Sequence, residues 1–586
     1  MFSAAAILLS ATLLADAPDT LRTAVVTSER GISVSRTDTI RVKNTNSISE
    51  VLSRSPGLVL ADYGGPAGLK SVNLRGLGSP HTTIRIDGIK VTNVQSGQSD
   101  LGLQGMETFS AAVIDYAQNS VNFITARPEF KSRGIAGKVS VSGGSFGTFL
   151  PSGRIDFKVS DKLSLSASAA GTVSKGDFTY DDDLKRSNND IAQLRAGLDA
   201  FGTIKGGDYA AKLYYNGSDR GTPGPVDWPS TDRQKDRNAF AQSHLRKRFS
   251  DIYKMSVSGK VGYDKLQYLS EWGESDYAQK EVQLNTSHKF HVLRRLDLSA
   301  VAELQWDGLE STCYEASRTD ATAIAGASLK LPRFNADLTL QWEGIFDRGA
   351  APISVFSPSA DFRFKILDGL DILGFARRAF RAPTFNELYY PGYGNPGLRP
   401  EDALLSDIGL EYKRAFSPRW ALKSKIDAFC NHLTDKIVSA PSGKNPSLWL
   451  PYNTGEVLCT GLDAEGTLTY DAQALKAAFS ARYSFQNAEG VPYMARHSAV
   501  VSADASVKGW SFGVLWNLRC GRKDSDGDMP DFNTLDISAA KEFRFKDGLT
   551  LTPKLFCRNL ADFRYETVTG YPMPGRSIFC ALDFTF

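Results

Sequence analysis

The chain has 586 residues, of which 42% are hydrophobic and 11% aromatic, and its mean hydropathy is −0.25. It carries 68 basic and 65 acidic residues, so its formal net charge is only +3, and no long run of lysine or arginine occurs. This balance gives no support for a nucleic-acid-binding surface, and the length exceeds that of one ordinary core, so two or more units are expected.

The one long apolar run lies at the start of the chain, in "FSAAAILLSATLLADAPDT". It is too short to span a bilayer as a helix, but it suits the apolar part of a secretory signal. Ala15, Asp16 and Ala17 form a small-x-small cleavage site, whereas no lysine or arginine precedes the run, so a buried N-terminal helix is the alternative. We predict a signal peptide over residues 1–17. Because no other stretch could be a transmembrane helix, the sequence excludes a helical membrane protein.

Residues 18–130 carry no long alternating runs and predict a small α+β unit. In "NTNSISEVLSRSPG", Ser47 is placed to cap a short helix and Glu50 to complete a capping box, and the Pro-Gly pair that follows ends the helix. Short strands broken by glycine-rich turns follow in "GLVLADYGG", "KSVNLRGLGSPHTTIRIDGIKV" and "NSVNFIT". A unit of this size can act as a plug that closes the lumen of a wide barrel, and such a barrel is predicted below for the residues that follow.

From about residue 134 onward the chain reads as one strand after another with a period of two. In "LDLSAVAELQWDG", alternate residues from Leu296 to Trp306 are apolar and their neighbours are mostly polar. A soluble sandwich has strands of about five or six residues, whereas membrane-barrel strands have roughly 9–11 and turn an apolar face to lipid. The alternation runs too long for a sandwich. We predict a mainly β fold in which residues 131–586 form a transmembrane barrel of about 22 antiparallel strands around the plug.

Three stretches between the predicted strands are long and polar, namely residues 179–190, 216–238 and 391–402. Outer-membrane barrels have short periplasmic turns and longer extracellular loops, so we expect these loops outside the cell. The last run, "RSIFCALDFTF", alternates up to the final Phe586. We expect it to close the barrel against the first strand, near Val139 to Ser142.

Four segments carry a resemblance to a known family. They are "DTLRTAVVTSER", the pair "SISEVLSRSPGLVL" and "VNLRGLGSPHTTIRIDGIKV", the box "FRAPTFNELYYPGYGNPGLRPE", and the end "NLADFRYETVTGYPMPGRSIFCALDFTF". With these in order, the chain resembles the TonB-dependent outer-membrane receptors over nearly its whole length. The resemblance implies TonB-dependent import of a scarce large ligand across the outer membrane of a Gram-negative bacterium. No G-x-S-x-G elbow, glycine-rich phosphate loop or H-E-x-x-H motif occurs, so we do not expect an enzyme.

The resemblance also implies the partners: the inner-membrane-anchored TonB protein, the outer-membrane insertion machinery, outer-membrane lipids and, as in some relatives, a surface lipoprotein cap. TonB would grip a short β-prone segment, which can add to the edge of a partner's sheet; an ordinary plug strand is the alternative. The TonB-contacting candidates are Asp19, Thr20, Leu21, Val25, Val26 and Thr27. In this family an aromatic last residue is part of the mark that the insertion machinery reads. Deleting Phe586 should therefore lower membrane levels before it affects binding.

The chain departs from the family pattern in two places. A stretch that members carry ahead of a "VNIIT"-like strand is missing between Asp115 and Val121, which puts the completeness of the plug in question. A loose plug would conduct ions in a planar bilayer, and a sealed barrel would contradict it. Haem receptors also place a histidine inside the box at 380–398, where this chain has none, and His81 reads as a turn residue.

The compact size, the "DTLRTAVVT" start, the plug strand "GSPHTTIRIDG" and the segment "GYGNPGLRPE" look most like the cobalamin receptors of the family. The resemblance therefore implies cobalamin or a related corrinoid as the ligand. A ferric siderophore or haem receptor of the same family is the alternative, and a passive porin or adhesin is the alternative of another class. Aromatic rings offer a flat amphipathic surface to a large conjugated ligand, although any one ring could instead belong to an interfacial girdle. The ligand-binding candidates are Tyr63, Lys70, Asn93, Gln95 and the segment on to Gln98, Trp228, Trp272, Tyr389, Tyr390 and Tyr393.

The remaining polar and sulfur-containing groups predict structural roles. Two acidic loops, Asp181 to Asp190 and Asp524 to Asp531, offer oxygen ligands for calcium, but solvated loops are favoured, and we expect no cofactor and no metal. The six cysteines are widely spaced without a C-x-x-C pair, which disfavours a metal cage. The plug residues Arg75, Arg85 and Asp87 are expected to make ion pairs within the plug or with the barrel.

Overall fold

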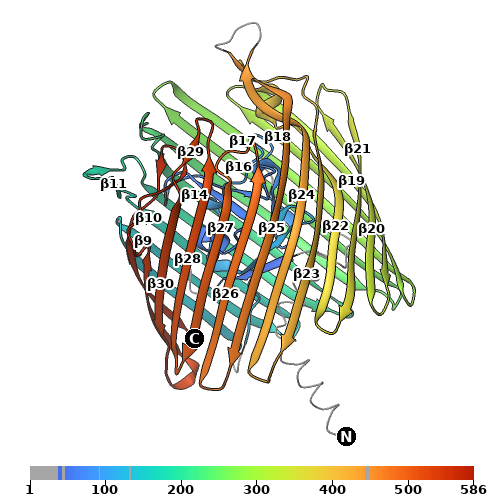
Figure 1. The fold of residues 1–586 in the computed structure, drawn as a ribbon, viewed down its shortest axis with the longest axis vertical. Helices are drawn as coiled ribbons and strands as arrows, with labels where there is room; N and C mark the ends of the chain where they lie inside the picture. Colours follow the sequence, from blue (N-terminus) through green and yellow to red (C-terminus); the bar gives the residue numbers. More distant parts are fainter. Residues whose placement is uncertain (1–36, 43–46, 92, 131–132, 443–447) are drawn as a thin grey trace.

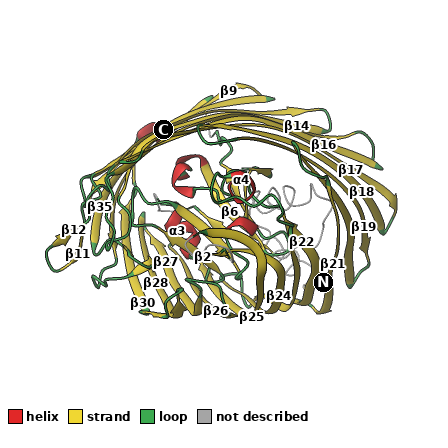
Figure 2. Ribbon diagram, turned by 90° about the horizontal axis from the view of Figure 1, so that it is seen from above, coloured by secondary structure: helices red, strands yellow, loops and turns green. Residues whose placement is uncertain are grey.

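The computed structural model describes residues 37–42, 47–91, 93–130, 133–442 and 448–586 (Figure 1). They form a closed antiparallel barrel of 22 strands with a small folded plug inside the lumen, which confirms the predicted fold class. Viewed from above, the plug elements lie inside the ring of barrel strands (Figure 2). The predicted signal peptide and the TonB-contacting residues lie outside the described part of the chain.

The barrel wall is built in chain order, each strand pairing with the next. Its strands are β8 Ile135–Gly144, β9 Thr148–Ser160, β10 Leu163–Ser174, β13 Ile191–Ile204, β14 Gly207–Thr222, β15 Asp232–Arg248, β16 Tyr253–Ser270, β17 Gly273–Leu293, β18 Leu296–Ser311, β19 Glu315–Lys330, β20 Phe334–Asp347, β21 Ile353–Leu367, β22 Leu370–Arg381, β23 Glu401–Ala415, β24 Trp420–Pro441, β25 Trp449–Asp471, β26 Leu475–Ala488, β27 Ala495–Val507, β28 Trp510–Lys523, β30 Phe532–Lys541, β32 Thr550–Arg558 and β35 Ser577–Thr585. Shorter pieces accompany the wall: β11 Thr179–Asp181, β12 Leu184–Lys185, β29 Asp528–Met529, β31 Phe543–Arg544, β33 Glu566–Val568 and β34 Tyr571–Pro572.

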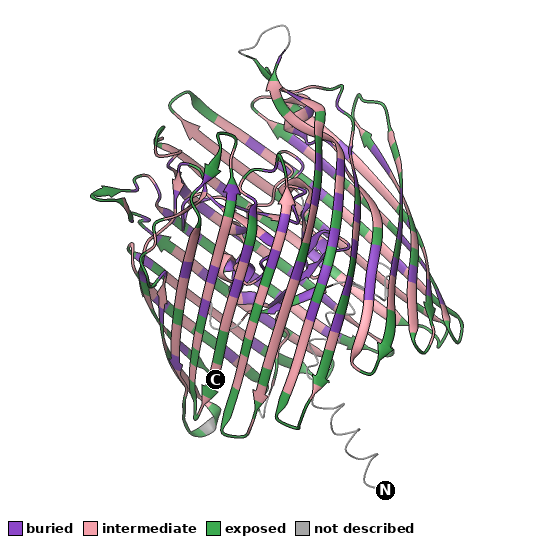
Figure 3. Ribbon diagram, viewed as in Figure 1, coloured by how far each residue is buried: buried purple, intermediate pink, exposed green. Residues whose placement is uncertain are grey.

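The predicted alternation is visible in the burial of the strands (Figure 3). On β18, Leu298 and Leu304 are exposed on the outside, whereas Asp297 and Asp307 are buried toward the lumen. An outer face that is this apolar suits contact with lipid acyl chains, and the inner face holds the polar groups. The Trp306 ring lies on the outer, exposed face, as expected.

One predicted loop is mostly strand. We expected residues 216–238 to be a long loop, but β14 continues to Thr222 and β15 begins at Asp232, so only residues 223–231 connect them. The strand ends are held by charged pairs, including Arg233 with Asp219 at 2.7 Å. Because both faces of these strand ends are polar, the period-two signal on which the prediction relied disappears there.

The barrel closes where predicted, between β35 and β8. Leu582 pairs with Val141 and Phe584 with Val139, and the Phe586 backbone exchanges hydrogen bonds of 2.9 and 3.0 Å with Gly137. A Cβ at position 137 would overlap ring carbons of Phe586. The last side chain therefore rests on bare backbone of the first strand.

The plug is an α+β unit built from short elements: β1 Thr37–Arg41, α3 Ile48–Ser53, β2 Leu58–Asp62, β3 Lys70–Leu74, η2 Ser79–His81, β4 Thr83–Ile86, β5 Ile89–Lys90, η3 Leu101–Leu103, η4 Met106–Thr108, β6 Phe109–Asp115 and β7 Ser120–Thr125. Its main sheet has the order β1-β6-β7-β4-β5, in which only β4 and β7 are parallel. Apolar side chains between this sheet, α3 and the β2–β3 hairpin form a shared core. No described helix is long and apolar enough to cross a membrane.

The predicted helix forms at α3, but its predicted capping box does not. Ser47 occupies the N-cap position, and its side chain does not accept the capping hydrogen bond. The Glu50 carboxylate receives the Arg558 guanidinium of β32 at 2.5 Å. A charge-assisted bond to the wall is stronger than a bond to a neutral peptide N–H, so the glutamate is used to attach the plug helix to the barrel.

The gap noted in the sequence is a tight hairpin. Strand β6 ends at Asp115, β7 begins at Ser120, and residues 116–119 turn between them with Asn119 at φ 46°. Both strands keep their places in the plug sheet, so the missing stretch shortens a connection and leaves the sheet whole.

Candidate functional site

The barrel has one end with short turns, where the C-terminus lies, and one end with longer connections (Figure 1). The connection between β22 and β23 contains the short helix α4, Phe385–Tyr389. Thr384 caps it by accepting from the Glu387 N–H at 3.2 Å, while the Glu387 carboxylate accepts from the Thr384 N–H at 2.7 Å. This capping box fixes where the following tyrosines point.

A loop of the plug lies directly against the start of α4. The Val94 and Gln95 carbonyls accept the first helical N–H groups, of Phe385 and Asn386, at 2.9 and 3.0 Å. Gly97 has a φ of +71°, and a Cβ there would lie 2.7 Å from the Thr384 methyl group. Plug loop and barrel loop therefore form one continuous surface, which brings together the predicted candidates Asn93, Gln95, Tyr389 and Tyr390.

Two further tyrosines complete this surface. Tyr314 donates to the Asn386 side chain at 2.6 Å and meets Tyr390 edge to face at 6.2 Å, and Tyr277 is buried beside them. Burial raises the pKa of Tyr314, and burial followed by the charge of Asp347 raises the pKa of Tyr389 to about 12. These phenols remain protonated donors at neutral pH. We call the set Tyr277, Tyr314, Tyr389 and Tyr390 the tyrosine cluster.

The sequence reasoning missed Tyr277 and Tyr314. Both lie at loop ends of neighbouring strands, in "ESDYAQ" and "STCYEA". Their signal was a lone tyrosine beside a turn, which is not distinguishable from an interfacial ring until the register of β17 and β18 is known. Tyr393 was a candidate and lies beyond the cluster, with its hydroxyl 2.6 Å from that of Ser439.

An ion-pair network joins the base of this loop to the plug. The Arg381 guanidinium binds Glu401 at 2.6 Å and Glu387 at 2.9 Å. His81, at the end of η2, forms a hydrogen bond with the same Glu401 carboxylate. His81 is thus a turn residue, as expected, and it also links plug to wall. Nothing in the sequence pointed to Glu401, which lies 320 positions away.

The other plug candidates lie under a different loop. The Asp62 N–H donates to the Thr567 hydroxyl at 3.0 Å, which returns a bond of 2.7 Å to the Asp62 carbonyl, and the Tyr63 ring meets Tyr571 at 5.0 Å. Lys70 is 8% exposed, and its ammonium donates to the carbonyls of Gly65 and Gly68. Because that ammonium is used inside the plug, Lys70 has a structural role here. Burial, opposed by the Lys70 charge, raises the pKa of Asp62.

Trp228 and Trp272 are isolated from both groups. They are 80% and 90% exposed on their loops. The structure therefore separates the candidates into the α4 surface, the loop over β2, and two free rings.

Arg75 joins the plug to the barrel wall through a buried ion-pair network. Its guanidinium binds Asp463 and Asp407, each at 2.7 Å, between the rings of Tyr116 and Phe429, each 4.2 Å away. Burial alone would lower the pKa of Arg75, but the two carboxylates raise it, so the charge is permanent. The predicted ion pairing holds for Arg75.

The other two predicted plug charges bond within the plug. Arg85 donates to the Gly88 carbonyl at 3.1 Å, and Asp87 accepts from the Thr125 N–H at 2.8 Å. Both contacts are hydrogen bonds within the plug.

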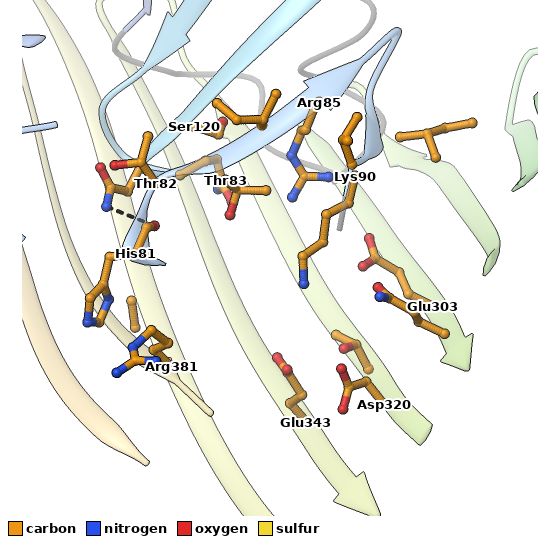
Figure 4. Close-up of a pocket in the computed structure, with 18 of the residues that line it drawn as sticks. His81, Thr82, Thr83, Arg85, Lys90, Ser120, Glu303, Asp320, Glu343 and Arg381 are labelled. Carbon is orange, nitrogen blue, oxygen red and sulfur yellow. Dashed lines mark hydrogen bonds between the residues drawn. The ribbon is translucent and has the colours of Figure 1, made fainter. Parts of the chain in front are cut away.

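On the other side of the plug lies a polar cavity of about 320 Å³. It is bounded by plug residues around β4, β5 and the β6–β7 turn, and by the inner faces of β16 to β22. Figure 4 shows Lys90 of the plug reaching toward Glu303, Asp320 and Glu343 of the wall.

The acidic loops are used in ion pairs and hydrogen bonds. Arg564 binds Asp181 and Asp182 at 3.1 Å each, and Thr569 donates to Asp524 at 2.5 Å. Among the described residues no group of three or more His, Cys, Asp or Glu is arranged to hold a metal ion. All six cysteines are free.

Comparison with known proteins places the chain. Residues 169–560 match the family "TonB dependent receptor-like, beta-barrel", and residues 25–123 match the "TonB-dependent Receptor Plug Domain". The vitamin B12 transporters BtuB of Vibrio vulnificus and of Photobacterium profundum are each 23% identical, over 95% of this chain and 92% of theirs.

Solved structures share the architecture. The FrpB iron transporter from Neisseria meningitidis has a TM-score of 0.77 at 12% identity, covering 94% of this chain and 99% of that one. The siderophore receptor PirA from Acinetobacter baumannii has a TM-score of 0.75 at 13% identity, covering 94% and 98%. At these identities the likeness concerns the fold alone.

Proposed function

Because the chain belongs to the TonB-dependent outer-membrane receptors, we propose that it imports cobalamin or a related corrinoid. Membership itself establishes TonB-dependent transport of a large ligand across the outer membrane of a Gram-negative bacterium, in a family of transporters. The identity of the ligand is the finer step. TonB would pull on the segment that includes Leu21, Val25 and Val26.

The observation that carries the corrinoid is the match of nearly the whole chain to two vitamin B12 transporters. The extracellular surface is compatible with it. The tyrosine cluster offers ring faces next to the plug loop at Asn93 and Gln95, and such rings bind large flat ligands without losing much side-chain entropy. The absence of a histidine in the box at 380–398 disfavours haem.

A titration tests the ligand. Purified receptor is titrated with cyanocobalamin, cobinamide, haemin and a ferric siderophore, and we expect saturable binding of the corrinoids only. Tyr390→Ala, which removes a ring from the cluster, should weaken that binding. Tyr263→Ala, which removes an exposed ring from the lipid face of β16, is the matched control and should not. Saturable binding of the siderophore without the corrinoids would replace the proposal.

Uptake tests the class of transport. Cells that carry the receptor should stop accumulating labelled cobalamin when a protonophore collapses the proton gradient. Uptake that persists would favour a passive porin.

A further inference from the structure

The two ends of the barrel expose side chains of opposite charge. The end with short turns faces the periplasm, and most of its exposed charged residues are basic. Such residues stand in separate turns around this rim, for example Lys162, Lys205, Arg333 and Arg419. The longer connections at the opposite end expose acidic residues such as Asp183 and Glu271. The periplasmic rim therefore attracts anions.

The positive charge of this rim is only partly neutralised by the protein itself. An aspartate in these turns pairs within its own turn, as Asp368 does with Lys365 at 2.5 Å. Arg294 and Arg295, which are the two residues between β17 and β18, are exposed and form no salt bridge with any residue that the structure describes. Two adjacent guanidinium groups thus remain available to an anion from outside the chain.

An aromatic stack lies beside this arginine pair. The Tyr253 ring of β16 stacks on Phe249 at 5.4 Å and on Phe290 of β17 at 5.0 Å. The His291 N–H donates to the Ile252 carbonyl at 2.7 Å. This bond joins the turn that carries Phe249 to the strand end that leads into the arginines, so rings and guanidinium groups occupy one part of the rim.

The apolar residues at this place are more exposed than contact with water alone would favour. Ile252 and Leu293, at the ends of the two turns, are each 61% exposed, and the Lys247 ammonium lies 4.8 Å from the centre of the Phe249 ring. Aromatic rings beside basic residues are typical of the boundary between lipid tails and headgroups. We call this part of the rim the basic turn site; it consists of Lys247, Phe249, Tyr253, Phe290, Arg294 and Arg295.

We propose that the basic turn site binds the headgroup of an anionic phospholipid in the periplasmic leaflet of the outer membrane. The two guanidinium groups hold the phosphate, for which their planar forks are suited. The acyl chains follow the outer face of β16 and β17, where Val261 and Leu284 are exposed. Any barrel contacts lipid; this inference specifies the charge of the lipid, its leaflet and the residues that hold it. It does not depend on which ligand the receptor imports.

The direction of the rings favours a lipid over an acidic periplasmic protein or the cell wall. Phe290 is exposed on the same face of β17 as Val282 and Leu284, which alternate with inward-facing residues along the strand. A ring on this face borders the bilayer, where a soluble partner has no access. A lipid can contact the ring and the arginines at once.

Lipid retention tests the proposal. The purified full-length receptor is placed in nanodiscs of equal parts phosphatidylethanolamine and phosphatidylglycerol and then released into mild detergent at low ionic strength. Native mass spectrometry counts the lipids that stay bound, and we expect an excess of phosphatidylglycerol. Replacing both arginines, by Arg294→Gln with Arg295→Gln, should lower that excess by about fivefold for each charge removed.

Matched variants separate the site from net charge and from misfolding. Lys175→Gln with Arg348→Gln removes two exposed charges from the opposite end of the barrel and should leave the excess unchanged. Arg294→Lys with Arg295→Lys keeps the charge and should retain most of it. Equal retention of the two lipids by the parent, or an equal loss in the Lys175 and Arg348 control, overturns the proposal. Equal retention together with sedimentation on isolated peptidoglycan, lost in the double glutamine variant at 294 and 295, would assign the site to the cell wall instead.

Discussion

The two sides of the plug meet the barrel in opposite ways. Toward β23, β24 and β25, which we call the anchored side, the apolar core of the plug continues into the wall through Leu405, Phe429 and Cys459, with Arg75 paired between two buried carboxylates. Toward β16 to β22, the cavity side, the contacts are polar: Lys260 and Gln283 donate to the Lys90 carbonyl at 3.2 and 3.1 Å, and a cavity of about 320 Å³ lies beside them. The difference indicates that the plug is held along one wall by apolar packing and a buried ion pair, and along the other by hydrogen bonds beside a polar cavity.

The largest expected effect is at Arg75. Arg75→Ala leaves Asp407 and Asp463 buried without their partner, and breaking a buried pair in this way costs about 3–5 kcal/mol. We expect the plug to become sensitive to protease while the barrel stays folded. Arg85→Ala, on the cavity side, is the control and should change protease sensitivity much less. Equal sensitivity in the two variants would remove the distinction between the sides.

A close backbone approach on the anchored side gives the next effect. Gly76 has a φ of +78°, and a Cβ there would lie 2.7 Å from the Cys459 sulfur. Gly76→Ala should lower the free energy of unfolding of the plug by about 1–3 kcal/mol through overpacking and backbone strain. Ser357→Ala on the cavity side removes a hydroxyl without a partner among the described residues and should be near neutral. Denaturant titration of both variants measures the two losses in free energy of unfolding. A larger loss in Ser357→Ala than in Gly76→Ala would contradict the expected difference between the two sides.

The extracellular link between plug and loop should show a smaller effect. Thr384→Ala removes one half of the capping box of α4, at a cost of about 1 kcal/mol. The loss should appear as faster hydrogen exchange at Phe385 and Asn386, whose N–H groups bind the plug loop. Thr384→Ser keeps the cap and should restore protection. Unchanged exchange in Thr384→Ala would mean that the plug loop alone holds the helix.

The smallest effect is expected at the ion pair between Arg233 and Asp190, which belongs to neither the anchored side nor the cavity side. The Arg233 hydrogen bond lowers the pKa of Asp190 from 3.8, so the pair stabilises the fold above that value and loses its contribution as the pH falls through the lower folded-state pKa. Because the pair is half exposed, it is worth less than about 0.5 kcal/mol. The melting temperatures of the parent and Asp190→Asn should differ slightly at neutral pH and converge in acid. A difference that grows in acid would contradict this sign.

The sequence was sufficient to predict the barrel, because the alternation of apolar and polar residues that marks a wall strand can be recognised within each strand alone. Alternation along a run such as "LDLSAVAELQWDG" reflects lipid on one side and lumen on the other at every residue. The closure of the barrel at Phe586 was predicted from the same periodicity. The plug was predicted because residues 18–130 lack that periodicity. The strand ends of β14 and β15 were missed because both of their faces carry polar residues, so the alternation of apolar and polar residues disappears there.

The site could be predicted only in part, because its contacts are between distant segments. Arg75 was recognised as a pairing residue, but Asp463 lies 388 positions away. Choosing that partner among many lumen carboxylates requires the register of β25 against the plug. The same holds for Tyr277 and Tyr314, which become neighbours of α4 only once the barrel has closed.

The packing of Phe586 on Gly137 has a practical consequence for handling the protein. A tag fused after Phe586 would begin where the phenylalanine ring already covers the first strand. It would therefore interfere with the pairing of β35 and β8 that closes the barrel. The extracellular turn between β16 and β17, where Trp272 stands exposed, offers a place for an epitope that leaves this closure intact.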